Sequence, residues 1–98
     1  MMSYKLSPDA VDDIERLFTF GIDRFGVSQA SKYIDGLEER LTKIANSPTF
    51  YPKVTHIKQG YRRSVYGIHS IYYRQLDKSR IEIMRVIGRE HIAQLSLT

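Results

Sequence analysis

Apolar residues recur at helical spacing early in the chain. The first such stretch follows Ser7-Pro8-Asp9, where a serine can cap a helix and a proline suits its first position. It runs to Gly26, a residue typical of a helix end. The apolar positions between them are Val11, Ile14, Leu17, Phe18, Gly21, Ile22 and Phe25. This pattern predicts a helix between Ser7 and Gly26.

A second helical stripe begins almost at once, at Val27-Ser28, with Ser28 as the expected cap. Its members are Ala30, Ile34, Leu37, Leu41, Ile44 and Ala45. Asn46-Ser47-Pro48 ends it. Because only one or two residues join the two helices, they are expected to pack as an antiparallel hairpin.

The remaining segments favour strands. Residues 2–7 alternate as a short strand does, and residues 47–60 are expected to form a loop. Beyond the loop, stretches rich in Tyr, Ile and Val are separated by turns near Gly67 and at Asp77-Lys78-Ser79. The predicted strands are residues 61–66, 70–76 and 80–87. Period-two geometry places Ile71 and Tyr73 on one face of their strand and Tyr72 and Arg74 on the other.

The order of these elements predicts one α+β domain over residues 1–98. An N-terminal strand, an antiparallel two-helix hairpin and a three-stranded antiparallel sheet follow one another, and the helices cover one face of the sheet. The first strand can add beside the last. The opposite face of the sheet is expected to be open and to carry much of the arginine.

Composition limits the cellular compartment that we expect for the protein and the kinds of site that it can hold. The chain has no cysteine, which excludes disulfides and thiolate metal sites and fits a reducing compartment. It begins without an apolar leader and has no apolar run of membrane-spanning length, so we expect a cytoplasmic protein without a membrane partner.

The charge of the chain is divided unevenly. Residues 1–52 carry six basic and eight acidic side chains, whereas residues 53–98 carry nine basic and three acidic ones. The second half has a net charge of +6 and the first half a net charge of −2, which together give +4. The second half is therefore a cationic surface on a nearly neutral body. Such a surface attracts polyanions or acidic protein segments.

Four segments of the chain stand out when they are taken together. They are Tyr4-Lys5-Leu6-Ser7-Pro8-Asp9-Ala10 with Asp13-Ile14, Gly60-Tyr61-Arg62-Arg63, His69-Ser70-Ile71-Tyr72-Tyr73-Arg74, and Ile81-Glu82-Ile83-Met84-Arg85-Val86-Ile87. In this order they resemble ParE-type toxins of the RelE/ParE superfamily. The resemblance covers roughly residues 3–89, and the element order agrees with it. Two positions depart from it: Gly88 stands where relatives often have a histidine, and residues 90–98 follow no family pattern.

The resemblance implies a function. ParE-type toxins are the stable half of bacterial toxin–antitoxin pairs, and they poison DNA gyrase by trapping it on cut DNA. Their ParD-like antitoxin has a DNA-binding dimerisation part and a tail that wraps the toxin. We therefore expect a hetero-oligomer with the antitoxin, gyrase as the target, and no sequence-specific DNA binding by the toxin alone.

Ribonuclease chemistry of the RelE kind is the main alternative. Metal-free RNA cleavage needs a base, cations that stabilise the phosphate charge, and an acid. RelE-like nucleases draw these groups from arginines on the sheet and a Tyr or His near the C-terminus. Arg63, Arg85 and His91 could take these roles, although a histidine in a tail is more often simply solvated. A general nucleic-acid-binding module is a third reading.

The binding interpretation assigns no catalytic residue, cofactor or metal. Its partner-binding candidates are Tyr61, Arg62, Arg63, Tyr72, Arg74, Arg85, Arg89 and Phe20. Arginines pair bidentately with carboxylates or phosphates, and tyrosines are frequent interface anchors, although half of them are equally expected to face the core. Charge reversal at Arg62 and Arg63 should then weaken an antitoxin complex. His56, His69 and His91 match no metal-ligand spacing.

Overall fold

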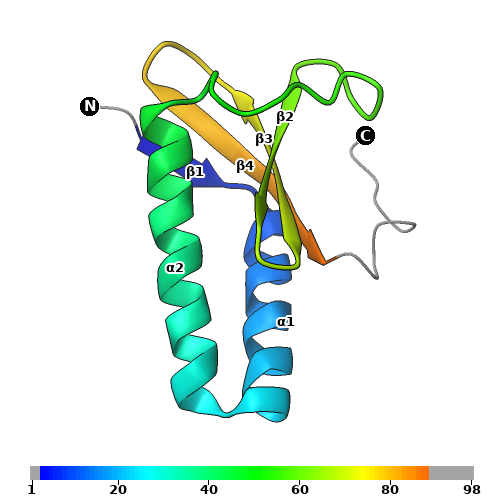
Figure 1. Ribbon diagram of the computed structural model, residues 1–98. Helices are drawn as coiled ribbons and strands as arrows, with labels where there is room; N and C mark the ends of the chain where they lie inside the picture. The colour runs from blue at the N-terminus through cyan, green and yellow to red at the C-terminus, as the bar shows by residue number, and fades with distance from the viewer. Residues whose placement is uncertain (1–2, 89–98) are drawn as a thin grey trace.

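The computed structural model describes residues 3–88. Its elements are β1 (Ser3–Leu6), α1 (Pro8–Phe25), α2 (Val27–Asn46), β2 (Tyr61–Tyr66), β3 (His69–Gln75) and β4 (Arg80–Gly88), shown in Figure 1. The four strands form one sheet in the order β1-β4-β3-β2. The predicted α+β class and order of elements are confirmed.

Two serines were expected to cap the helices, and one of them does. The Ser7 hydroxyl accepts a hydrogen bond from the Ala10 amide at 3.0 Å, as the sequence predicts. The prediction for Ser28 is wrong, because α2 already begins at Val27 and has no side-chain cap. Gly26, with φ of +87°, reverses the chain in a single residue and leaves no room for a capping turn.

The first strand adds beside the last, as predicted, and it pairs in parallel from Ser3↔Arg80 to Leu6↔Ile83. Beyond Ile83, β4 continues, and none of the described residues forms a strand on that side. The register with β3 also changes there, from Tyr73↔Ile83 to Tyr72↔Arg85, so Met84 is an extra residue on β4. This β-bulge moves the inward-facing positions of β4 from odd to even numbers.

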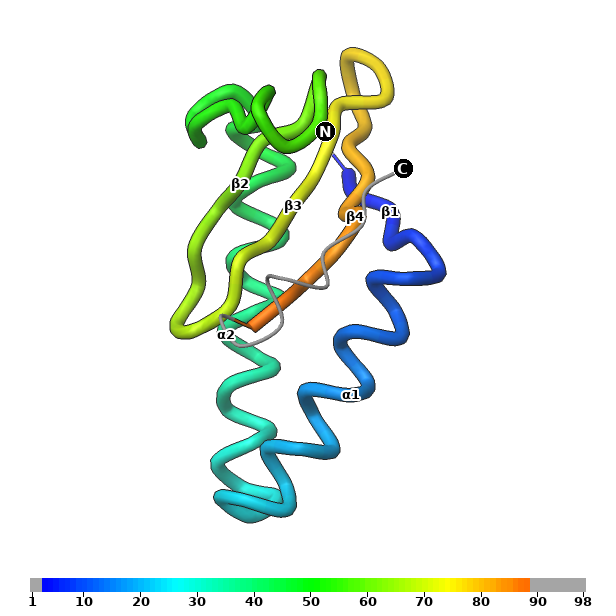
Figure 2. Tube along the Cα trace, turned by 90° about the vertical axis from the view of Figure 1, so that its right-hand side faces the viewer, coloured from blue at the N-terminus to red at the C-terminus, as the bar shows by residue number. Residues whose placement is uncertain are grey.

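The main core lies between the sheet and the helical hairpin. Its buried members are Ala10, Leu37, Leu41, Ile44, Ala45, Ile71, Tyr73, Ile81, Ile83 and Val86. Ile71 and Tyr73 thus share one face of β3, as predicted, and the structure shows that this face is turned toward the helices. Figure 2 shows α2 behind β2 and β3 and α1 beside β4, while the tip of the hairpin extends beyond the sheet.

The opposite face of the sheet is not fully open, which corrects the expectation from the sequence. Val54 in the loop before β2 packs on Tyr61 and Tyr72, and Ile57 joins this second small core. Lys53 also forms an isolated antiparallel bridge with Arg62, so part of the loop runs beside β2. The sequence did not reveal this cover because Val54 and Ile57 are isolated apolar residues in a polar segment.

Candidate partner-binding groove

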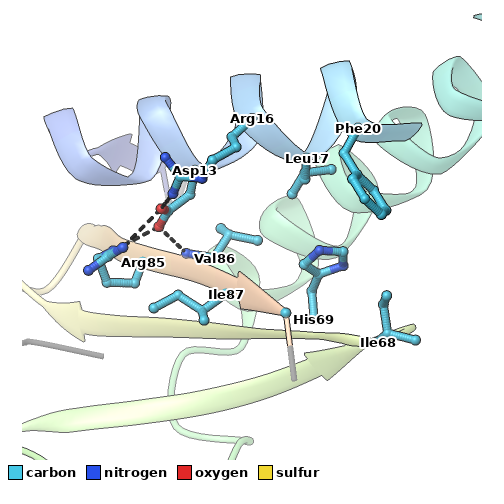
Figure 3. Close-up of a pocket in the computed structure, with 10 residues that line it drawn as sticks. Asp13, Arg16, Leu17, Phe20, Ile68, His69, Arg85, Val86 and Ile87 are labelled. Carbon is cyan, nitrogen blue, oxygen red and sulfur yellow. Dashed lines mark hydrogen bonds and ion pairs between the residues drawn. The ribbon is translucent and has the colours of Figure 1, made fainter. Parts of the chain in front are cut away.

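A groove of about 460 Å³ separates α1 from the end of β4. Its lining residues are Asp13, Arg16, Leu17, Phe20, Ile68, His69, Arg85, Val86, Ile87 and Gly88. Figure 3 shows that they come from α1, from β4 and from the β2–β3 turn. The groove exists because β1 ends at Leu6, so α1, not another strand, flanks the last residues of β4.

Asp13 joins the two walls of the groove. Its carboxylate accepts hydrogen bonds from Arg85 Nε at 2.8 Å, Arg85 Nη2 at 3.0 Å and the Val86 amide at 2.9 Å. It also pairs with Arg16 one helical turn later. The Asp13 side chain is only 1% exposed, so these partners offset the cost of burying a charge. The hydrogen bond to Asp13 raises the pKa of Arg85.

The outer part of the groove is apolar and exposed. Phe20 is 51% exposed and Ile68 is 58% exposed, and both lie at the end of the groove opposite the ion pair (Figure 3). Leu17 and Ile87 also line the groove, and Ile87 is buried. Phe20 is exposed because it falls off the main apolar stripe of α1. An apolar rim beside a cationic wall is typical of a protein-binding surface.

Tyrosine contacts hold the turn that bears Ile68. Tyr33 Oη lies 2.8 Å from His69 Nδ1 and 3.2 Å from the Tyr66 carbonyl, and Tyr66 Oη donates to the Tyr33 carbonyl at 2.9 Å. The Tyr33 and Tyr66 rings are 4.8 Å apart. Burial raises the pKa of both tyrosines. The β2–β3 hairpin is thus attached to α2, and one rim of the groove is fixed in place.

The structure separates the other predicted partner residues. Tyr61 and Tyr72 are 5% and 0% exposed, so both belong to the small core and offer little surface. Arg62 donates to the Tyr51 and Thr49 carbonyls at 2.7 and 3.3 Å, and Arg74 is bonded to Glu82. Among the candidates within the described part of the chain, only Arg85 and Phe20 line the groove.

The nuclease candidates are only partly brought together. Arg63 pairs with Tyr72, and Tyr72 with Arg85, in one row across the sheet. The Tyr72 hydroxyl is buried and has no hydrogen-bond partner within residues 3–88. Arg89 and His91 lie outside the described residues. Within residues 3–88, no group of three potential metal ligands occurs and no helix has the length and hydropathy of a membrane span.

Sequence reasoning missed the central role of Asp13. It was assigned to the helix start, where acids favour the positive end of the dipole. A signal was present, because Asp13 lies three residues after Ala10 and four before Leu17, on the apolar face of α1. Ile68 was missed because one isoleucine in a turn carries no pattern.

Comparison with known proteins identifies the family. Residues 4–93 match the family described as ParE toxin of type II toxin-antitoxin system, parDE. Toxin ParE1 of Caulobacter vibrioides is 33% identical over 97 residues, covering 99% of each chain. Toxin ParE1 of Mycobacterium tuberculosis is 32% identical over 84 residues, covering 86% of each chain.

A solved structure shares the fold. A chain of the chromosomal ParDE TA system from P. aeruginosa superposes with a TM-score of 0.75 at 19% identity, covering 90% of this chain and 96% of its own length. The matched family spans nearly all the described elements, from β1 to the end of β4. The chain therefore belongs to the family of ParE toxins of type II toxin–antitoxin systems.

Proposed function

We propose that this toxin acts by binding DNA gyrase and trapping it on cleaved DNA, and that a ParD-like antitoxin neutralises it by occupying the groove between α1 and β4. The observation that carries the proposal is the pairing of Arg85 with the buried Asp13. The ion pair holds Arg85, the arginine of the sheet that lines the groove, in a fixed position, so Arg85 stabilises the wall of this binding surface.

The groove suits the tail of an antitoxin. Its apolar rim at Phe20 and Ile68 can receive apolar side chains of an amphipathic segment. Arg16, whose side chain is 62% exposed, lies next to that rim and can pair with an acidic residue of the same segment. A segment with both properties, disordered until it binds, would cover the groove and order on contact.

Ribonuclease activity has one observation in its favour, the row formed by Arg63, Tyr72 and Arg85. Two features of the row argue against it. The Arg85 guanidinium already donates twice to Asp13, and the Tyr72 hydroxyl lies under the loop rather than at the surface. A general acid or base must come within hydrogen-bond reach of its substrate. The row therefore favours packing over phosphate chemistry.

An assay with purified gyrase tests the proposal. The toxin should inhibit supercoiling and accumulate cleaved plasmid, and prior addition of the cognate antitoxin should prevent both effects. Ribosome-bound mRNA incubated with the same toxin should stay intact. Cleaved transcripts together with unaffected gyrase would replace the proposed function by the RelE-type one.

A further inference from the structure

A second pocket, of about 340 Å³, lies at the other end of the sheet. It forms where the loop before β2 folds over the start of β2 and the end of β3. Its lining residues are Pro48, Lys53, Thr55, Gln59, Gly60, Tyr61, Arg62, Tyr73, Arg74 and Gln75. The groove of the proposed antitoxin site includes His69, at the opposite end of β3. No residue is shared by the two linings.

The lining of this pocket is cationic. Lys53, Arg62 and Arg74 contribute three positive charges, and none of the lining residues is acidic. The carboxylate of Glu82, a residue that is 7% exposed, pairs with Arg74 and offsets part of its positive charge. Both Arg74 bonds go to the same oxygen, at 3.1 and 2.8 Å, so the guanidinium keeps further N–H groups for a ligand.

Arg62 is held in place before any ligand arrives. Its Nη1 donates to the Tyr51 and Thr49 carbonyls. Because these carbonyls are neutral, they do not cancel the positive charge of the guanidinium. Lys53 is exposed, and its side chain has no partner among residues 3–88. Thr55 and Gln59 add neutral hydrogen-bonding groups at the rim. A pocket lined by one fixed cation and by two further cations, Lys53 and Arg74, suits a compact anion that accepts several hydrogen bonds.

We propose that this pocket binds a phosphodiester group of a nucleic-acid backbone. A phosphate offers more acceptor directions than one carboxylate, which matches donors arriving from the loop, β2 and β3. Backbone contacts of this kind carry no sequence information, so they agree with a toxin that does not read DNA sequence. This inference rests on the pocket alone and does not depend on gyrase as the target.

Binding of labelled oligonucleotides, measured by fluorescence anisotropy over a salt series, tests the proposal. DNA and RNA of the same sequence form separate arms and distinguish the two sources of the phosphate. Lys53→Glu should weaken binding about tenfold and lower the slope of log K against log salt by about one. Lys32→Glu makes the same charge change on α2, next to Phe25 at the tip of the hairpin, and should have a much smaller effect.

A second variant separates local chemistry from net charge. Arg74→Gln combined with Glu82→Gln leaves the total charge unchanged and lets two amides replace the ion pair. It should still weaken oligonucleotide binding several-fold. Equal losses for Lys53→Glu and Lys32→Glu, or wild-type binding by the Arg74/Glu82 variant, would overturn the proposal. Absence of binding by the wild type would also overturn it, even if gyrase poisoning is observed.

Discussion

The Asp13 carboxylate accepts a backbone hydrogen bond from β4 that a further strand would otherwise accept. Beyond Ile83, the edge of β4 opposite β3 is paired with no strand among residues 3–88, and its Val86 amide would need an acceptor. The Asp13 carboxylate supplies that acceptor at 2.9 Å and neutralises Arg85 at the same time. A single side chain therefore satisfies both the backbone and the charge at the base of the groove.

Replacing Asp13 by alanine should cost about 2–4 kcal/mol of unfolding free energy, because Arg85 and a buried amide lose their partner together. The loss stays below that of a fully buried pair, since the Arg85 side chain is 20% exposed. Urea denaturation measures it. Asp12→Ala, at the exposed neighbouring position, should change stability by less than about 0.5 kcal/mol. Similar effects for both variants would mean that Asp13 acts only through the helix dipole.

Arg62 was predicted as a partner-binding residue, and the structure places it away from the groove, where it is hydrogen-bonded to loop carbonyls. Its Cα partner Tyr73 lies in the main core, so its side chain points toward the helices and the loop carbonyls. Charge reversal there would disturb the loop itself. The double charge reversal at Arg62 and Arg63 is therefore a poor probe of the antitoxin, whereas substitutions in the groove leave the loop intact.

Elements with repeated patterns were predicted well, and features made by single residues were not. The helices and strands follow from periodicity because each of several apolar side chains contributes to the same buried face. The bulge at Met84 has no such repetition. It depends on how α1 and β1 meet the edge of β4, which is a tertiary property. The strand ends also shifted slightly, with β3 beginning at His69 and β4 ending at Gly88.

The contact between α2 and β2 requires a glycine. A Cβ atom at Gly36 would meet the Tyr66 hydroxyl, which donates to the Tyr33 carbonyl. Gly36→Ala should therefore destabilise the protein by about 1 kcal/mol, even though alanine favours a helix by a similar amount. Thermal or urea unfolding measures the change.

The Tyr66→Phe background tests the cause of this cost. It removes the hydroxyl that the new methyl group would meet, so the same Gly36→Ala substitution should cost less there. The difference between the two backgrounds is the coupling energy of the pair, expected to be about 1 kcal/mol. Equal costs in both backgrounds would assign the effect to the helix backbone alone.

At the level of the whole molecule, the fold keeps two surfaces apart. The groove lies where β4 ends and β3 begins, and the cationic pocket lies where β3 ends and β2 begins. The seven residues of β3 place them about 20 Å apart. Of the basic residues after residue 52, Arg85 lines the mixed groove, and Lys53, Arg62 and Arg74 line the cationic pocket. This difference in charge suits partners of different chemistry.

Because the two surfaces are separate, a substitution in either one should impair the binding of one partner and not of the other. Phe20→Ser removes an exposed aromatic group from the groove rim and should weaken antitoxin binding about tenfold or more, while oligonucleotide binding stays at the wild-type level. Lys53→Glu should do the converse. Phe50→Ser, which removes an even more exposed phenylalanine, 77% against 51%, controls for the loss of surface hydrophobicity and should leave antitoxin binding unchanged.

Isothermal titration with the cognate antitoxin and anisotropy with the oligonucleotide measure the two affinities on the same protein samples. If Phe20→Ser and Phe50→Ser weaken the antitoxin complex equally, the groove is not its site. If Phe20→Ser and Lys53→Glu each weaken both partners, the two surfaces are coupled or shared. Independent defects would mean that one small sheet, extended at one end by a helix and covered at the other by a loop, presents two binding sites that act separately.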